Sequence, residues 1–214
     1  MTRRMSILFV LLALLSITGC AANKSVEAQR LKAISSIEVV RTATPEIQRH
    51  SAATIVGGGL LFGGFGMEAV GAEAGKELRE RCKLDEFGVL VTREFVEQVQ
   101  KQIPGWPSMR VLETPVEAGY VAKDAYMLQF QPGMVWLYTF GPKGLLIAVT
   151  ATLTSPSGEE LWTYNASYSQ KQAGREREIE ELEADSCKLL KEEMQYAARV
   201  LAGQFVTDLG GLKR

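Results

Sequence analysis

Histidine is nearly absent from this sequence, and its scarcity limits the chemistry that the chain can perform. The only histidine among the 214 residues is His50, and a single histidine cannot supply the ligand spacing of a histidine-based zinc site. Ser51 follows it directly, but a catalytic serine needs a base aimed at it and a third group that orients the base. Adjacency in the chain supplies neither. We therefore expect no metal, no cofactor and no catalytic residue, and interpret His50 as an exposed loop residue.

A strong excess of charge is also missing. Lys and Arg number 24 and Asp and Glu number 25, which gives a formal net charge of −1. Nucleic-acid-binding domains carry a concentrated basic face, so we expect no nucleic-acid partner. The densest charge run, Glu176 to Asp185, stands before an apolar stripe and complements the positive N-terminus of a helix. We interpret it as a solvated helix face rather than a cation site.

The apolar run near the N-terminus is too short to cross a bilayer, which takes about 20 residues in a helix. This run, MSILFVLLALLSI, follows Arg3 and Arg4 and precedes small residues. A positive segment, a short apolar segment and small residues at a cleavage point are typical of a secretory signal. The motif Ile17-Thr18-Gly19-Cys20 resembles the lipobox of bacterial lipoproteins, in which the cysteine is acylated and becomes the first mature residue.

The lipobox resemblance implies a domain organisation and a location. Residues 1–19 would be the signal peptide, residues 20–32 a tether lipidated at Cys20, and residues 33–214 one periplasmic domain. An anchor with several acyl chains gives stable membrane attachment. Ala21 rather than Asp after the cysteine implies sorting to the outer membrane of a bacterium with two membranes. The alternative is an ordinary cleavage site beside a chance cysteine.

Cysteine is scarce as well, with Cys82 and Cys187 the only ones besides Cys20. In an exported protein, two cysteines in an oxidising compartment are expected to pair. We therefore predict a disulfide between them. Cys187 as a nucleophile is the weaker interpretation, because it lies on the apolar stripe of a predicted helix.

Hydrophobic periodicity predicts an α+β domain. A four-residue repeat of apolar side chains predicts an amphipathic helix over 87–103, and a stripe from Cys187 to Phe205 predicts a long closing helix. Alternating or β-rich runs predict strands over 34–41, 109–113, 126–131, 135–140, 145–154 and 161–169. We expect an antiparallel-rich sheet of about five strands with two main helices packed on one face.

This element order and the segment LTSPSGEELW at 153–162, a strand, a glycine turn and a strand that opens with Trp, carry a second resemblance. Both are similar to the small α+β domain of periplasmic proteins such as the TolB amino-terminal domain and the curli-secretion lipoprotein. The resemblance implies a shape and transfers no binding residue.

Six aromatic residues leave two interpretations open: Trp106, Trp136, Trp162, Tyr138, Tyr164 and Tyr168. They would line a groove for a peptide or glycan, or they would fill the core between sheet and helices. Their alternation within strands favours the core.

The segment from Thr54 to Lys76 holds eight glycines. It does not match the phosphate-loop pattern, because only three residues separate Gly71 from Gly75 and Glu77 stands where that pattern has a Ser or Thr after the lysine. We therefore expect no bound nucleotide. Gly59 and Gly63 are four residues apart, as are Gly71 and Gly75. On a helix, each pair would leave one face without side chains, so that another backbone could pack closely against it. We predict a compact turn and helix that pack on the same domain, on a second copy or on the membrane. The alternative is a flexible apolar loop.

These observations predict a lipid-anchored outer-membrane protein that faces the periplasm and is not an enzyme. We expect it to act as an accessory or assembly component of the envelope, through an envelope partner protein or self-association. The alternatives are a periplasmic module that binds a glycan or peptide and, less favoured, a hydrolase.

Overall fold

The computed structural model describes residues 33–45, 47–50, 64–117, 120, 122, 124–138 and 144–211. The signal peptide, Cys20, the tether, Gly59 and Gly63 lie outside these residues. None of the described helices is both long and apolar enough to cross a membrane.

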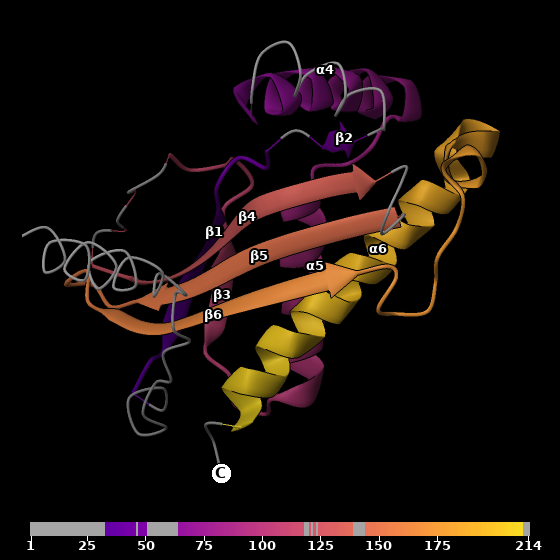
Figure 1. The fold of residues 1–214 in the computed structure, drawn as a ribbon. Coiled ribbons are helices and arrows are strands. Elements are labelled where there is room, and N and C mark those ends of the chain that lie inside the picture. Colours follow the sequence, from indigo (N-terminus) through magenta and orange to yellow (C-terminus); the bar gives the residue numbers. More distant parts are fainter. Residues whose placement is uncertain are drawn as a thin grey trace, which may run out of the picture.

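One mixed sheet of six strands forms the centre of the domain (Figure 1). The strands are β1 (Ser36–Arg41), β2 (Gln48–His50), β3 (Ser108–Val111), β4 (Tyr126–Tyr138), β5 (Gly144–Thr154) and β6 (Glu160–Ser169). Their order is β3-β1-β4-β5-β6, and β2 also pairs with β4.

The prediction of an antiparallel-rich sheet of about five strands is wrong. β1 is parallel to both β3 and β4, β2 is parallel to β4, and only the β4-β5-β6 part is antiparallel. Parallel neighbours need a long crossover connection, and two helices lie between β2 and β3 in the chain. The strand patterns do not reveal which distant strands such a crossover brings together.

Strand β4 also corrects the sequence interpretation, which predicted two separate strands over 126–131 and 135–140, on either side of Pro132-Gly133. The structure has one strand of 13 residues with a register shift between Pro132 and Met134. On its other side, β1 pairs only as far as Phe130 and β2 begins only at Trp136. Proline lacks a backbone N–H, so it is tolerated at such a bulge between two pairings.

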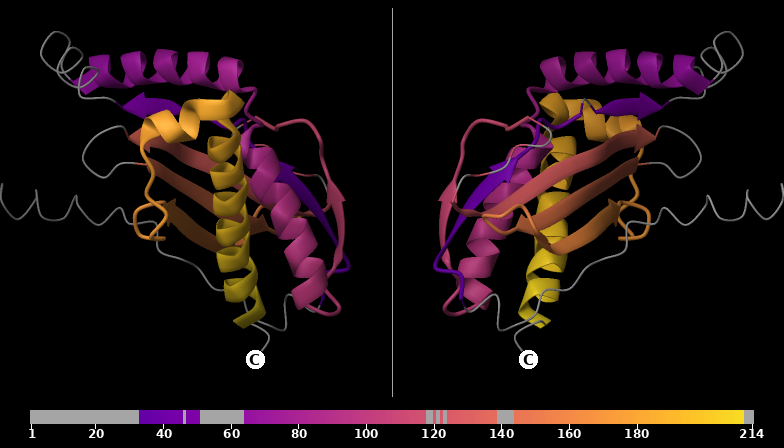
Figure 2. Two further views of the ribbon diagram at one scale, coloured as in Figure 1. Left: turned by 90° about the vertical axis from the view of Figure 1, so that its right-hand side faces the viewer. Right: turned by 90° about the vertical axis from the view of Figure 1, so that its left-hand side faces the viewer.

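Two long helices cover one face of the sheet, as the periodicity predicted (Figure 2). They are α5 (Phe87–Gln102) and α6 (Ile179–Gly211). The apolar stripe of α6 is buried throughout: Cys187, Leu190, Met194, Ala198, Leu201 and Phe205. The ring of Phe130 on β4 contacts Phe95 on α5 and Phe205 on α6, with centroids 5.1 and 5.5 Å apart. The core therefore lies between the sheet and this helix pair.

The α6 helix is interrupted near its start. Three consecutive residues have positive φ: Asp185 (48°), Ser186 (57°) and Cys187 (61°). Each left-handed residue costs roughly 1 to 2 kcal/mol, so neighbouring contacts must hold this break in place. Glu183 just before it accepts ion pairs from Arg49 (3.0 Å) and from Arg81.

A third helix, α4 (Gly64–Cys82), contains the second half of the glycine-rich segment and crosses over β2 (Figure 1). Leu78 and Cys82 bury one side of α4 in the main core. A Cβ added at Gly75 would overlap the backbone carbonyl oxygen of Ile47, just before β2. At Gly75, therefore, α4 packs on its own domain by the close backbone approach that only glycine permits.

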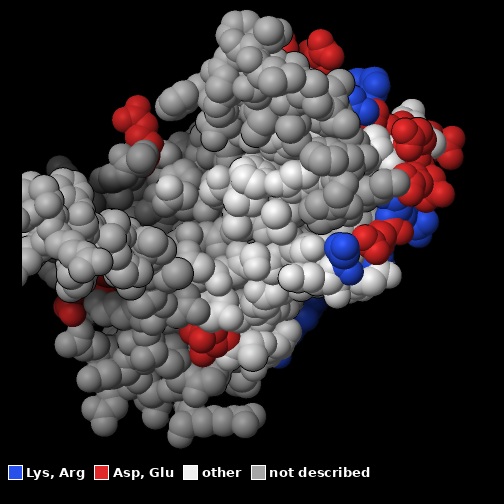
Figure 3. Space-filling model, in the orientation of Figure 1, with Lys and Arg blue, Asp and Glu red and all other residues white. Residues whose placement is uncertain are grey.

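The face of the sheet opposite α5 and α6 is mostly polar and uncharged. A small cluster of Val40, Ala122 and Met127 lies on this side of β1 and β4. Farther along, cross-strand contacts join hydroxyl and amide side chains, such as Thr150 with Asn165 at 2.7 Å. Figure 3 shows uncharged side chains in the middle of this face, while most charged ones lie at the margin near the start of α6.

Candidate functional site

The structure joins Cys82 and Cys187 in a disulfide, the pair expected from the sequence. Cys82 ends α4 and Cys187 lies at the break in α6, with their Cα atoms 5.4 Å apart. Both residues are 1% exposed. The bond ties α4 to α6 across 105 residues of sequence, and it removes Cys187 as a free nucleophile.

His50 is not the exposed loop residue that the sequence predicted. It ends the short strand β2 and is 7% exposed. Its ring stacks on Tyr138 at 5.2 Å and meets the edge of Trp136 at 5.3 Å. Burial raises the pKa of the Tyr138 hydroxyl above its ordinary value. The stretch around His50 shows no strand-like alternation, so only the pairing with β4 reveals this placement.

The six aromatic residues do not form one groove. Trp162 and Tyr168 are buried on the helix-covered face, where the indole Nε1 of Trp162 donates to Asp208 at 2.7 Å. Tyr164 stacks on Trp162, and Trp106 packs against the same core. Trp136 and Tyr138 surround His50 on the opposite face. The core interpretation therefore holds for the residues of β6.

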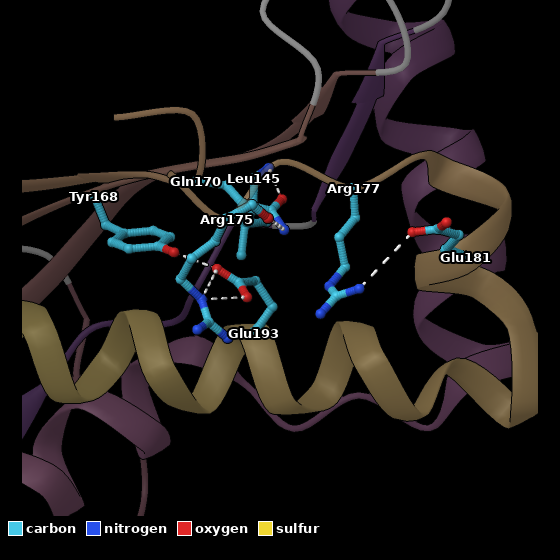
Figure 4. A network of polar contacts seen from close by, with 7 residues as sticks. All are labelled: Leu145, Tyr168, Gln170, Arg175, Arg177, Glu181 and Glu193. Atoms are coloured by element: carbon cyan, nitrogen blue, oxygen red, sulfur yellow. Dashed lines mark hydrogen bonds and ion pairs between the residues drawn. The ribbon is translucent and has the colours of Figure 1, made fainter. Parts of the chain in front are cut away.

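A network of polar side chains lies where the β6–α6 connection meets α6 (Figure 4). At its centre is Glu193 on α6, which is 2% exposed. Its carboxylate accepts hydrogen bonds from the Tyr168 hydroxyl and from Nε of Arg175, the latter at 3.0 Å. Burial and the neighbouring Glu193 carboxylate raise the pKa of Tyr168 well above its ordinary value. Tyr168 therefore stays protonated as a donor.

The loop that carries Arg175 is fixed by a buried glutamine, Gln170. The Gln170 side chain accepts from the Leu145 N–H and donates to the Arg175 carbonyl, both at 2.9 Å. The guanidinium of Arg175 also lies 4.1 Å from the ring centroid of Tyr196, a cation–π contact. Arg175 is therefore held by its backbone, by Glu193 and by Tyr196.

Beside Arg175, a depression of about 510 Å³ opens between α6 and the turn that joins α4 to α5. Leu84, Leu90 and Met194 give it an apolar floor. Its lining includes four basic residues and two acidic ones: Lys83, Arg175, Lys191 and Arg199, with Asp85 and Glu192. The sequence alone does not reveal this site, because its residues come from separate segments with no motif spacing. Among the described residues, no group of three or more His, Cys, Asp or Glu is placed to hold a metal ion.

A second cavity, the α5–β3 groove, lies between α5 and the edge of the sheet and measures about 340 Å³. Its apolar lining comes from Val89 and Val96 on α5 and from Val111 and Leu112. Val89 and Val111 are 36% and 43% exposed, among the few large apolar side chains that the described chain leaves in solvent.

The two edges of the sheet differ. Among the described strands, β3 pairs only with β1, so its other side is unpaired within this part of the chain. At the β6 edge, by contrast, the side chain of Gln204 on α6 donates to the Ser167 carbonyl at 3.3 Å. The edge at β3 is therefore the more open one for contact with another chain.

Comparisons with known proteins give no family. No family model and no curated protein matches the chain. Among solved structures, a PelC dodecamer from Paraburkholderia phytofirmans is 10% identical over 88% of this chain and 95% of that chain, with a TM-score of 0.39. A PelC variant from the same organism gives 10% identity, 88% and 92% coverage and a TM-score of 0.38. These likenesses are too weak to assign a family or a function.

Proposed function

We propose that this chain is a lipid-anchored protein of the bacterial outer membrane whose α+β domain faces the periplasm. It acts as an assembly component of the envelope, by contact with other proteins and without catalysis. The lipobox-like sequence Ile17 to Cys20 supports the anchor. The buried bond between Cys82 and Cys187 supports export, because disulfides are rare in proteins of reducing compartments.

The assembly role rests on the open edge of β3 beside the α5–β3 groove. Ser108 and Leu112 direct their N–H groups to β1, so the alternating N–H and C=O groups of Met109 and Val111 point to the unpaired side. A strand from another protein can bond to such an edge and place alternate side chains in an adjacent pocket. The groove offers that pocket through Val89 and Val96.

Val111→Lys is expected to abolish this contact while leaving the fold intact. A lysine on an edge strand opposes strand addition, because pairing would desolvate its charge. Val111 is 43% exposed, so we expect the free energy of unfolding to change by less than about 1 kcal/mol. Crosslinking in intact cells followed by mass measurement of the products should show the assembly formed by the wild type and lost by the variant.

Asn165→Lys is the matched control, since Asn165 is an exposed residue on the uncharged face of β6. It adds the same charge far from the β3 edge and should leave the crosslinked products unchanged. If the Val111→Lys protein gives the same products as the wild type, assembly does not use this edge. A wild-type protein that crosslinks neither to itself nor to another protein contradicts the assembly role.

A further inference from the structure

We propose that the depression beside Arg175 binds a ligand that carries a carboxylate or phosphate group, with Arg175 as its anchor. The proposed ligand site lies apart from the proposed function and depends on neither the lipid anchor nor the edge of β3. It follows from how Arg175 is held, from the cations around it and from the floor of the depression.

Arg175 is oriented before any ligand arrives. Its Nε atom donates to the Glu193 carboxylate (Figure 4). Its guanidinium carbon lies over the ring of Tyr196. Within the described part of the chain, the hydrogen bonds of the Arg175 side chain use Nε, which leaves the terminal nitrogens Nη1 and Nη2 for a ligand. A guanidinium presents these donors as a fixed fork that matches carboxylate and phosphate oxygens. Little side-chain entropy remains to be lost on binding.

Two further cations line the depression, Lys83 from the turn between α4 and α5 and Lys191 from α6. Lys83 follows Cys82 directly, and Lys191 lies one helical turn beyond Cys187 on α6. Both lysines are exposed, and neither forms an ion pair with a described carboxylate. Their charges therefore remain available to an incoming anion.

The other charges of the rim partly offset one another. Arg199 lies 3.5 Å from Glu94, and Glu192 lies 4.0 Å from Lys188. Glu193 balances the charge of Arg175, and Asp85 is the remaining carboxylate of the lining, so Lys83 and Lys191 together outweigh it. The apolar floor excludes water from one side of a bound anion, which strengthens these contacts. The volume of about 510 Å³ is within the range of small-molecule sites.

Calorimetric titration of the full lipidated chain in uncharged detergent tests the site with three matched sugars. Glucuronate carries a carboxylate, glucose 6-phosphate carries a phosphate, and glucose carries neither. We expect at least one anionic sugar to bind at least tenfold more tightly than glucose, because hydrogen bonds between charged groups are the strong ones. The comparison between the two anions identifies which group the site prefers.

Three variants separate ligand binding from folding. The double change Lys83→Gln and Lys191→Gln alters two exposed side chains and is expected to weaken anion binding about tenfold or more. Arg175→Lys keeps the charge but loses the fork, and should also weaken binding. Lys171→Gln is the control, because Lys171 is an exposed residue of the same loop that does not line the depression. It should bind as the wild type does.

Equal affinity for glucose and for both anions overturns the proposal, as does wild-type affinity in the Lys83/Lys191 double variant. Loss of binding in the double variant with wild-type affinity in Lys171→Gln supports it. Crosslinking and membrane fractionation are separate measurements, so either inference can fail while the other stands.

Discussion

Replacing both Cys82 and Cys187 with alanine is expected to lower the free energy of unfolding by about 2 to 5 kcal/mol. The disulfide closes a loop with a sequence separation of 105, and a crosslink across such a loop strongly restricts the unfolded chain. The two cysteines are 1% exposed each, so their loss also leaves the contact between α4 and α6 less well packed.

Urea unfolding of the full chain, with and without the two substitutions, measures this effect. The wild type treated with a thiol reductant is the control, and its midpoint should move toward that of the double variant. Thiol titration of the oxidised, unfolded protein should find neither Cys82 nor Cys187 free. A double variant within about 0.5 kcal/mol of the oxidised wild type would contradict a stabilising disulfide, since changes of that size are typical of surface positions.

Gly75→Ala is expected to destabilise the domain by about 2 to 3 kcal/mol, the upper part of the range for overpacked sites. The added methyl group would overlap the carbonyl oxygen of Ile47, which is backbone and has no rotamer to change. The α4 helix would have to move away from β2 to accommodate it. The gain in helix propensity, about 1 kcal/mol, offsets only part of this strain.

Gly203→Ala is the matched control, because it makes the same change within a helix, α6. The nearest atom to its added methyl would be Oε1 of Gln98 at 3.3 Å, the far end of a flexible side chain. Helix propensity should therefore dominate and leave Gly203→Ala neutral or more stable than the wild type by up to about 1 kcal/mol. If thermal unfolding places both variants at the same midpoint, α4 is not seated on Ile47 as the structure shows.

The sequence predicted the helices and strands that bury only one face, because their apolar residues recur at the regular spacing of that face. The α5 and α6 helices and the strands β5 and β6 lie close to their expected bounds, because each packs one side against the same core. It did not predict the parallel pairing of β1 with β4, nor the bulge at Pro132, because both depend on which distant strands become neighbours.

The candidate site was less predictable than the fold. The disulfide partners followed from there being only two cysteines in the predicted domain. Arg175, Glu193 and Tyr168, by contrast, come from a loop, a helix and a strand, and no spacing between them signals contact. His50 was misplaced for a similar reason, since a three-residue strand is too short to show alternation.

Intact mass spectrometry of the protein purified from the outer-membrane fraction tests the lipid anchor most directly. We expect a chain that begins at Cys20 and carries the added mass of several acyl chains, and a Cys20→Ala protein that lacks this mass and no longer matures or fractionates normally. A mature chain that begins at another residue, or a Cys20→Ala protein that stays lipidated in the outer membrane, would contradict the anchor.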